Sequence, residues 1–273
     1  MDSVRTLGAR ALRRRPQLRS RYDQNRVPTP VVDRLSDEDL ATLNEVLPWQ
    51  SFTVDSSGRP FGRAAFQGKR TEPGVIPDPR IQRFDERFGL AGKHVLEVGC
   101  FEGVHTTALC QRAKWVTAID ARIENVVKTT VRCAMFGESP DVAVVDLDEP
   151  GDDDELLRAD LCHHVGVLYH LVDPVGHLLL LGRTIGEGVM LDTQIAAPGE
   201  ATEKYEVGGR SYPFKPYREA GREDVFSGMR PQSRWLTLET IESVLGEGGF
   251  GTVEVVEERA ERNGPRVMLF ASR

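Results

Sequence analysis

Long apolar runs are missing from this sequence of 273 residues, and their absence narrows the kinds of protein it can encode. No run approaches the roughly 18 residues of a membrane-spanning helix, and no apolar segment follows the first residues, so we expect neither membrane spans nor a secretory signal. Cysteine is also scarce, and its four positions (100, 110, 133 and 162) lack the spacing of a metal site. We therefore expect buried, reduced thiols in a cytoplasmic protein.

Basic side chains are in the minority outside the first segment. Residues 1–26 contain eight arginines against two aspartates, whereas the rest of the chain has 27 basic and 40 acidic side chains. The body of the protein therefore repels polyanions, and only residues 1–26 would attract them. We interpret this segment as a solvated helix, and the alternatives are a contact with nucleic acid or an acidic partner, or an organellar transit peptide.

The stretch of residues 94–110 organises the rest of the chain. A short apolar run ends at Glu97, Gly99 and Gly103 then bracket a tight turn, and apolar residues follow at helical spacing. A strand, a glycine turn and a helix in this order place backbone N–H groups against a ligand. The glycines are needed because side chains there would block that approach.

Two further apolar runs also end in an acid. Residues 115–119 are followed by Asp120, and residues 142–145 by Asp146. Asp120 lies about 20 residues after the first glycine, where a doubly wound fold presents a carboxylate to a ribose diol. Acids at the carboxyl ends of adjacent parallel strands face the crevice where ligands bind, so we expect a nucleoside-containing ligand there.

Together with residues 166–174, these motifs resemble those of the class I S-adenosylmethionine-dependent methyltransferases over residues 85–273. The resemblance implies an α/β fold with a Rossmann-like, doubly wound, seven-stranded sheet, mostly parallel with an antiparallel last strand. It implies S-adenosylmethionine as the cofactor. No cluster of His, Asp or Glu residues in the sequence has the spacing of a metal site, so we expect no metal. The implied cofactor-binding residues are Glu97, Gly99, Cys100, Phe101, Gly103, Asp120, Ala121, Asp146, Leu147 and Gly166. Phe101 stands where the family usually has glycine, which argues against a dinucleotide.

The chain divides into an N-terminal helical and irregular extension, residues 1–84, and a methyltransferase domain, residues 85–273. In the extension, Ser36 is the expected cap of a helix, and residues 48–82 form an irregular lid. In the domain, a polar insertion at residues 196–234 is expected to cover the acceptor site. The remaining strands are expected at residues 161–167, 188–192, 252–256 and 266–270, with helices at 124–135, 173–183 and 236–245.

His170 is the expected general base, because an imidazole titrates near neutral pH and can take a proton from an acceptor. Tyr169 beside it would order the acceptor. The expected acceptor-binding residues are Asp192, Arg230 and Lys69, and arginines in the insertion suggest an acceptor with a carboxylate or phosphate. His163 and His164 should point to opposite faces of their strand.

The segment from Gly166 to His170 is also similar to the tRNA wobble-uridine carboxymethyltransferases, in which the cofactor carries a carboxylate. In this resemblance Tyr169 and Arg230 match positions near the transferred group, but the expected lysine of the lid has no counterpart, because Gln50 and Ser51 stand there. Ordinary S-adenosylmethionine is therefore the expected donor.

The sequence thus predicts O-methylation of a small molecule by a soluble enzyme. The alternatives are a tRNA-modifying (carboxy)methyltransferase, a non-catalytic cofactor-binding protein and, least favoured because of Phe101, a nicotinamide dehydrogenase. The oligomeric state is left open.

Overall fold

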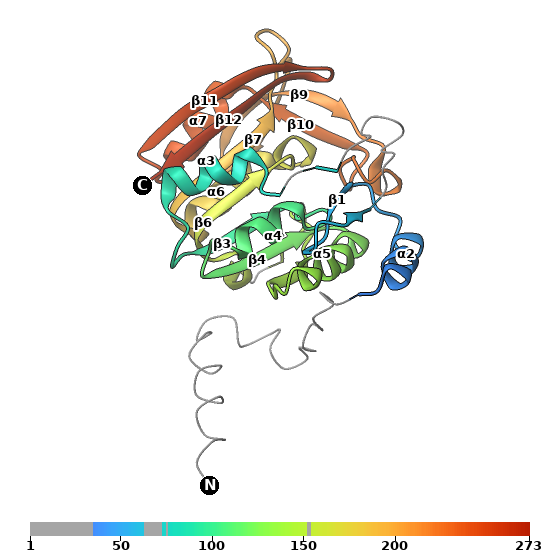
Figure 1. Ribbon diagram of the computed structural model, residues 1–273. Helices are drawn as coiled ribbons and strands as arrows, with labels where there is room; N and C mark the ends of the chain where they lie inside the picture. Colours follow the sequence, from blue (N-terminus) through green and yellow to red (C-terminus); the bar gives the residue numbers. More distant parts are fainter. Residues whose placement is uncertain (1–34, 63–72, 75, 152–153) are drawn as a thin grey trace.

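The protein is built around a seven-stranded sheet with the strand order β11-β12-β7-β6-β3-β4-β5. The computed structural model describes residues 35–62, 73–74, 76–151 and 154–273 (Figure 1). The strands of this sheet are β3 (His94–Val98), β4 (Trp115–Asp120), β5 (Asp141–Val144), β6 (Ala159–Val165), β7 (Ile185–Gln194), β11 (Thr252–Glu261) and β12 (Gly264–Ser272). Only β12 runs antiparallel to its two neighbours, which confirms the expected fold.

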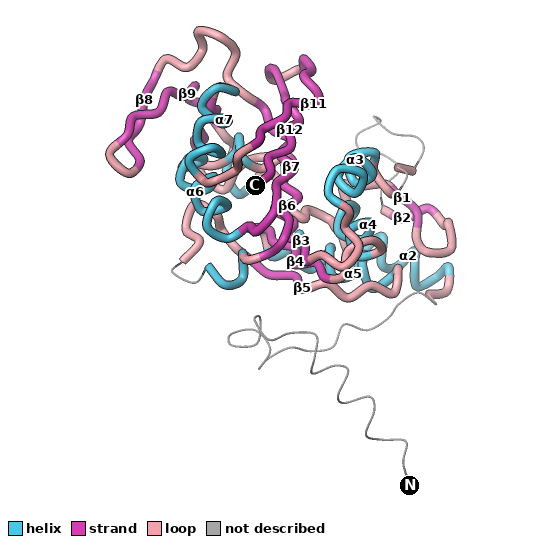
Figure 2. The backbone as a smooth tube through the Cα atoms, turned by 90° about the vertical axis from the view of Figure 1, so that its left-hand side faces the viewer, coloured by secondary structure: helices cyan, strands magenta, loops and turns pink. Residues whose placement is uncertain are grey.

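Helices cover both faces of the sheet, as a mostly parallel sheet requires (Figure 2). The helices are α2 (Asp37–Val46), α3 (Pro79–Phe88), α4 (Val104–Cys110), α5 (Ile123–Met135), α6 (Pro174–Thr184) and α7 (Leu238–Glu247), with 3-10 turns η2 (Asp154–Leu157), η3 (Leu168–His170) and η4 (Gly221–Glu223). Helices α3, α4 and α5 lie on one face, and α6 and α7 lie on the other. One apolar core fills each face.

The region expected to be an irregular lid contains regular structure. Strands β1 (Thr53–Val54) and β2 (Pro60–Phe61) form a small hairpin, and α3 begins at Pro79. Asp78 caps α3 by accepting from the backbone N–H of Arg80, and Pro79 occupies the first turn, where its missing N–H costs nothing. The periodicity was too short to indicate this helix. The expected boundary between residues 84 and 85 falls inside it.

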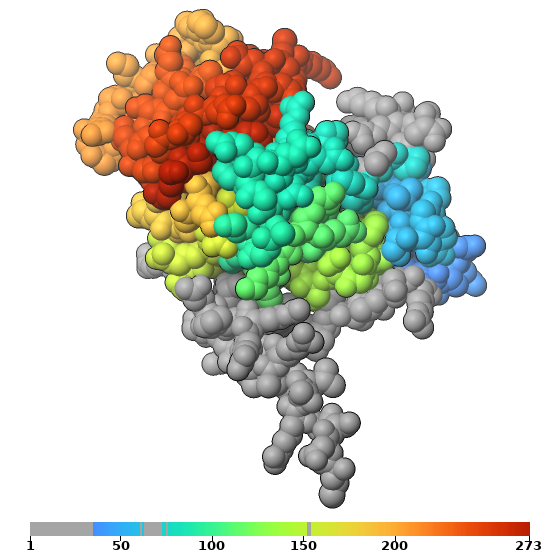
Figure 3. Space-filling view, turned by 60° about the vertical axis from the view of Figure 1, so that its left-hand side comes forward, coloured from blue at the N-terminus to red at the C-terminus, as the bar shows by residue number. Residues whose placement is uncertain are grey.

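The insertion folds as a separate three-stranded antiparallel sheet in the order β10-β9-β8. Its strands are β8 (Glu203–Val207), β9 (Arg210–Arg218) and β10 (Gln232–Leu236). In the space-filling view, this orange sheet and the red closing strands form one end of the molecule, and the blue segment that starts at residue 35 lies toward the other (Figure 3). Residues 1–26 and Lys69 lie outside the described residues, so their expected roles stay predictions.

Candidate active site

The turn after β3 is held in a conformation that glycine allows. Gly99 has a φ of 77°, and a Cβ there would lie 2.2 Å from Cγ2 of Val167. The N–H groups of Gly99 and Cys100 both donate to the carbonyl of Ile119, at 2.9 and 3.0 Å. These bonds tie the turn to the end of β4, so the backbone of the turn borders the carboxyl edge of the sheet.

Phe101, the departure from the family pattern, has a left-handed φ of 50° without being glycine. Its N–H donates to Oδ2 of Asp120 at 3.0 Å, which helps to hold the turn in that conformation. Its ring contacts Phe226 of the insertion, with ring centroids 5.6 Å apart. Phe101 therefore forms part of an aromatic wall and leaves the cavities on either side open.

The smaller of two cavities lies over the ends of β3, β4 and β6 and has a volume of about 270 Å³. Seven of the expected cofactor residues line it: Gly99, Phe101, Asp120, Ala121, Asp146, Leu147 and Gly166. His170 and Tyr169 line it as well. The backbone edge and acids of the sheet thus enclose a space next to the expected base.

Asp120 is held rigidly at the base of this cavity. Its Oδ1 accepts from the backbone N–H of Arg122 at 2.9 Å and from Nδ2 of Asn125 at 3.0 Å. Burial raises the pKa of Asp120, and these hydrogen bonds oppose the shift. A fixed carboxylate of this kind can accept hydroxyl groups of a ribose without further ordering.

Arg230 is not among the residues that line the two cavities, and its expected place near the transferred group stays a prediction. Its Nη2 is 3.0 Å from Oδ2 of Asp146 and 2.7 Å from Oε1 of Glu149. It therefore braces the acid after β5 at the outer side of the smaller cavity. A different arginine lies over the ring of Tyr169.

That arginine is Arg266 of β12. Its Cζ lies 5.6 Å from the centroid of the Tyr169 ring, and it is only 9% exposed. Burial raises the pKa of the Tyr169 hydroxyl, and Arg266 opposes this shift. Sequence reasoning missed Arg266 because only the antiparallel register of β12 against β7 brings it to the site.

The larger cavity has a volume of about 790 Å³ and meets the smaller one at five shared residues. These are Gly99, Phe101, Val165, Gly166 and Phe226. Its wall also includes Glu97, Cys100, Asp78, Arg80, His105 and Arg266, with residues 50–53 of the N-terminal segment. The wall is therefore rich in charged and polar groups.

Asp192 does not bind an acceptor directly in this arrangement, because its side chain is fully buried. Its carboxylate lies 2.5 Å from Nε of Arg266, 2.9 Å from Nη2 of Arg259 and 3.4 Å from Nη1 of Arg80. Its three arginine partners cover the carboxylate, and Asp192 is not among the residues that line either cavity. The expectation for Asp192 is corrected accordingly: it holds arginines, two of which line the larger cavity.

His170 has a carboxylate partner that sequence reasoning missed. Nδ1 of His170 is 2.9 Å from Oε1 of Glu219, at the end of β9. Glu219 also accepts from the hydroxyls of Ser227 and Ser233 and from the N–H of Gly228. Burial alone would raise the pKa of Glu219, but His170 and these donors lower it to about 2. Glu219 is therefore a charged group that fixes the ring of His170.

Glu102, also missed, joins the N-terminal segment to the domain. Its fully buried carboxylate accepts from the N–H groups of Gln50 and Ser51, at 2.9 and 2.7 Å, and pairs with Nζ of Lys128 at 2.9 Å. Its place inside the glycine turn was the only available signal. This contact positions one wall of the larger cavity.

Gly103 and Glu97, which were also expected to bind the cofactor, lie outside the smaller cavity. Gly103 lines neither cavity: it begins α4 with a φ of 78°, where a Cβ would lie 2.9 Å from Cα of Thr129. Glu97 lines the larger cavity, and burial raises its pKa to about 8. Contacts of the cofactor residues with a cofactor stay predictions.

Comparisons with known proteins agree with this architecture, although no family model matches the chain. The N-terminal domain of EvdMO1, solved in the presence of S-adenosylhomocysteine and D-fucose, is 25% identical with a TM-score of 0.67. The alignment covers 90% of this chain and 99% of that domain. The chain thus shares its fold with this S-adenosylhomocysteine-bound domain and carries the motif order expected of class I S-adenosylmethionine-dependent methyltransferases.

Curated relatives match shorter parts. A tRNA U34 carboxymethyltransferase of Methylococcus capsulatus is 30% identical over 165 residues, 58% of this chain and 47% of that protein. A ubiquinone biosynthesis O-methyltransferase of Pseudomonas paraeruginosa is 30% identical over 113 residues, 37% of this chain and 49% of that protein. The chain thus spans about half the length of these relatives. Within the described residues, every helix is too short or too polar to cross a membrane.

Proposed function

We propose that this protein transfers the methyl group of S-adenosylmethionine to a hydroxyl oxygen of a small polar molecule. The observation that carries the proposal is the pairing of His170 with Glu219 at the wall of the smaller cavity, where the ring centroid of His170 lies 4.1 Å from that of Tyr169. In this proposal the adenosine occupies the smaller cavity, with its ribose at Asp120. The methionine end extends past Gly99, so the sulfonium lies near Gly166 and Tyr169.

The acceptor would enter through the larger cavity. A volume of about 790 Å³ falls in the range of small-molecule sites and exceeds what the methionine end needs. Its wall of arginines and carboxylates suits a molecule with several hydroxyl or anionic groups. The EvdMO1 domain was solved in the presence of D-fucose, and this supports a sugar-like acceptor.

The proton of the acceptor would go to His170. Its Nδ1 is bonded to Glu219, which favours the tautomer with a proton on Nδ1 and leaves Nε2 as the acceptor. As the oxygen–carbon bond forms, the carbon–sulfur bond breaks, Nε2 takes the hydroxyl proton and S-adenosylhomocysteine leaves. Glu219 then stabilises the resulting imidazolium, because it stays charged.

The test starts with mass spectrometry of small molecules released from the purified protein, followed by transfer of a deuterated methyl group to a panel of sugars, phenols and hydroxy acids. With an acceptor in hand, we expect His170→Ala to lower kcat by about 10²- to 10⁴-fold and to leave the affinity for S-adenosylhomocysteine nearly unchanged. Glu219→Gln should lower kcat less and shift the pH profile. A His170→Ala variant with normal turnover would remove the base from the mechanism.

A second candidate is the modification of tRNA, favoured by the similarity to a tRNA U34 carboxymethyltransferase. Arg266 beside Tyr169 could pair with a carboxylate on the cofactor. Release of a carboxylated cofactor from the purified protein, with salt-sensitive tRNA binding that requires residues 1–26, would favour this function.

A further inference from the structure

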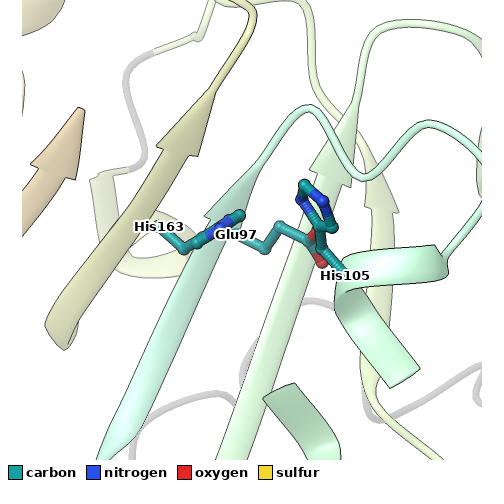
Figure 4. A group of neighbouring side chains, drawn as sticks. All are labelled: Glu97, His105 and His163. Carbon is teal, nitrogen blue, oxygen red and sulfur yellow. The ribbon is translucent and has the colours of Figure 1, made fainter. Parts of the chain in front are cut away.

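Three side chains from different elements converge next to the larger cavity, and two of them, Glu97 and His105, line it (Figure 4). Glu97 comes from β3, His163 from β6 and His105 from the first turn of α4. Glu97 and His163 are register partners on adjacent parallel strands, so they project from the same face of the sheet. One possible ligand atom from each residue lies within 4.8 Å of those of the other two.

The polar atoms of this cluster, defined as Glu97, His105 and His163, are buried without enough partners. Among the described residues, Nδ1 and Nε2 of His163 and Oε2 of Glu97 have no hydrogen-bond partner. His163 and Glu97 are each 1% exposed. Rings surround His163 instead, with Phe84 at 5.7 Å and His105 at 5.1 Å between centroids. Unpartnered groups at such depth are costly and call for a ligand.

The chemistry of the cluster suits a metal ion. Two imidazoles and one carboxylate form a donor set that holds zinc, iron, manganese or cobalt, with coordination positions left open. Both ring nitrogens of His163 lack a hydrogen-bond partner among the described residues, so the ring has a lone pair available for an ion. Asp78, with Oδ2 3.5 Å from Nε2 of His105, is a carboxylate of the kind that orients a metal-bound imidazole.

The positive charge of Arg80, which lies next to His105, is balanced by two carboxylates. Arg80 has Nη2 3.4 Å from Nε2 of His105, but its guanidinium is bonded to Asp78 at 2.9 Å and lies 3.4 Å from Asp192. Its charge is therefore directed to carboxylates outside the cluster. The carboxylate of Glu97 has no such cation, since the described residues pair no lysine or arginine with it.

We propose that Glu97, His105 and His163 bind one divalent transition-metal ion whose open coordination positions face the larger cavity. The ligand atoms lie within 4.8 Å of one another, and a small rotation of His105, which is half-buried at the cavity wall, would bring all three to about 2.0–2.2 Å from one ion between them. An oxygen of the acceptor would complete the coordination, and this last role rests on the proposed function.

The test is titration of the metal-free, full-length protein with CoCl₂, followed by visible absorption and calorimetry. We expect one Co²⁺ per chain, with the intense absorption of a low-coordinate site. The variants are His163→Phe, which keeps a ring beside Phe84 and removes two unpartnered nitrogens, and His105→Asn at the cavity wall. Both should weaken binding by more than about 100-fold. The control is His94→Asn at the opposite end of β3.

Two results would overturn the proposal. Wild-type protein that binds no Co²⁺ at millimolar concentration, with weaker S-adenosylhomocysteine binding in His163→Phe, would assign the cluster to the ammonium group of the cofactor. Equal Co²⁺ binding by all three variants would place the ion elsewhere. The readout does not require turnover, so a protein that binds Co²⁺ and transfers no methyl group would contradict the proposed function alone.

Discussion

The two cavities differ in the hydrogen bonds that their acidic side chains accept. In the smaller cavity, Asp120 accepts hydrogen bonds on both oxygens from the chain itself. At the larger cavity, Glu97 has an oxygen without a hydrogen-bond partner among the described residues, and His163 next to it has two such nitrogens. The smaller cavity is thus organised before any ligand arrives, whereas the inner wall of the larger one is completed only by a ligand.

The largest expected effect concerns the wall of the larger cavity. Glu102→Ala removes a fully buried carboxylate and leaves Lys128 and two backbone N–H groups without it. We expect the free energy of unfolding to fall by about 3–5 kcal/mol, measured by urea denaturation. The control Glu86→Ala changes an exposed glutamate of α3 and should cost less than about 0.5 kcal/mol. Equal losses of unfolding free energy in the two variants would mean that the cavity wall does not depend on the pairing of Glu102 with Lys128.

The next largest effect tests whether the adenosine part of the cofactor binds in the smaller cavity. Asp120→Ala should weaken S-adenosylhomocysteine and free adenosine by a similar factor of about 10–100, because the lost bonds to the ribose involve a charged acceptor. Calorimetry measures both affinities. Asp141→Ala, at the opposite end of the sheet, is the control and should bind both normally. Loss of S-adenosylhomocysteine binding with unchanged adenosine binding would contradict our assignment of the smaller cavity.

The sequence predicted the residues that lie close together along the chain. The turn from Glu97 to Gly103 and the acids Asp120 and Asp146 follow from strand ends, because parallel strands bring those ends to one edge. Glu219 and Arg266 could not be predicted in this way. They reach the site through antiparallel registers of β9 and β12, and pairing of that kind leaves no local signal.

The seven-stranded sheet was easier to predict than the elements added to it, which are helix α3 and the sheet of the insertion. Buried parallel strands appear as short apolar runs, so the order and direction of the sheet followed from the motifs. Helix α3 and the sheet of the insertion were missed, because their strands and helix carry charged residues at most exposed positions. Tertiary contacts of a few residues, such as Ile81 and Phe84, stabilise them instead.

A smaller effect compares the adjacent histidines of β6, which point to opposite faces as the sequence predicted. His164 shares a hydrogen bond of 2.9 Å with His177 away from both cavities, and burial lowers the pKa of both, that of His177 to about 4. The unfolded chain binds a proton at each ring below about pH 6.5, but the folded chain does not. Stability is therefore complete above about pH 6.5 and is lost as the pH falls toward 4.

The double variant His164→Leu/His177→Leu should reduce this loss by up to about 1.4 kcal/mol per pH unit for each ring. Urea denaturation between pH 7.5 and 4.5 provides the measurement. Replacement of both partners by apolar groups should change stability little at pH 7.5, since neither polar group is left alone. An unchanged slope would mean that these rings are protonated in the folded protein, contrary to their burial.

The smallest effect is expected outside both cavities. Arg83 of α3 and Glu257 of β11 form an ion pair of 2.5 Å, but their side chains are 47% and 35% exposed. Water screens such charges, so Arg83→Ala should lower the free energy of unfolding by less than about 1 kcal/mol, and added salt should shrink the difference. Urea denaturation at two salt concentrations measures both. A loss of stability comparable to that of Glu102→Ala would show that an exposed ion pair stabilises the fold as much as a buried one. The difference that we draw between the two cavities, which depends on the cost of buried groups without partners, would then lose its physical basis.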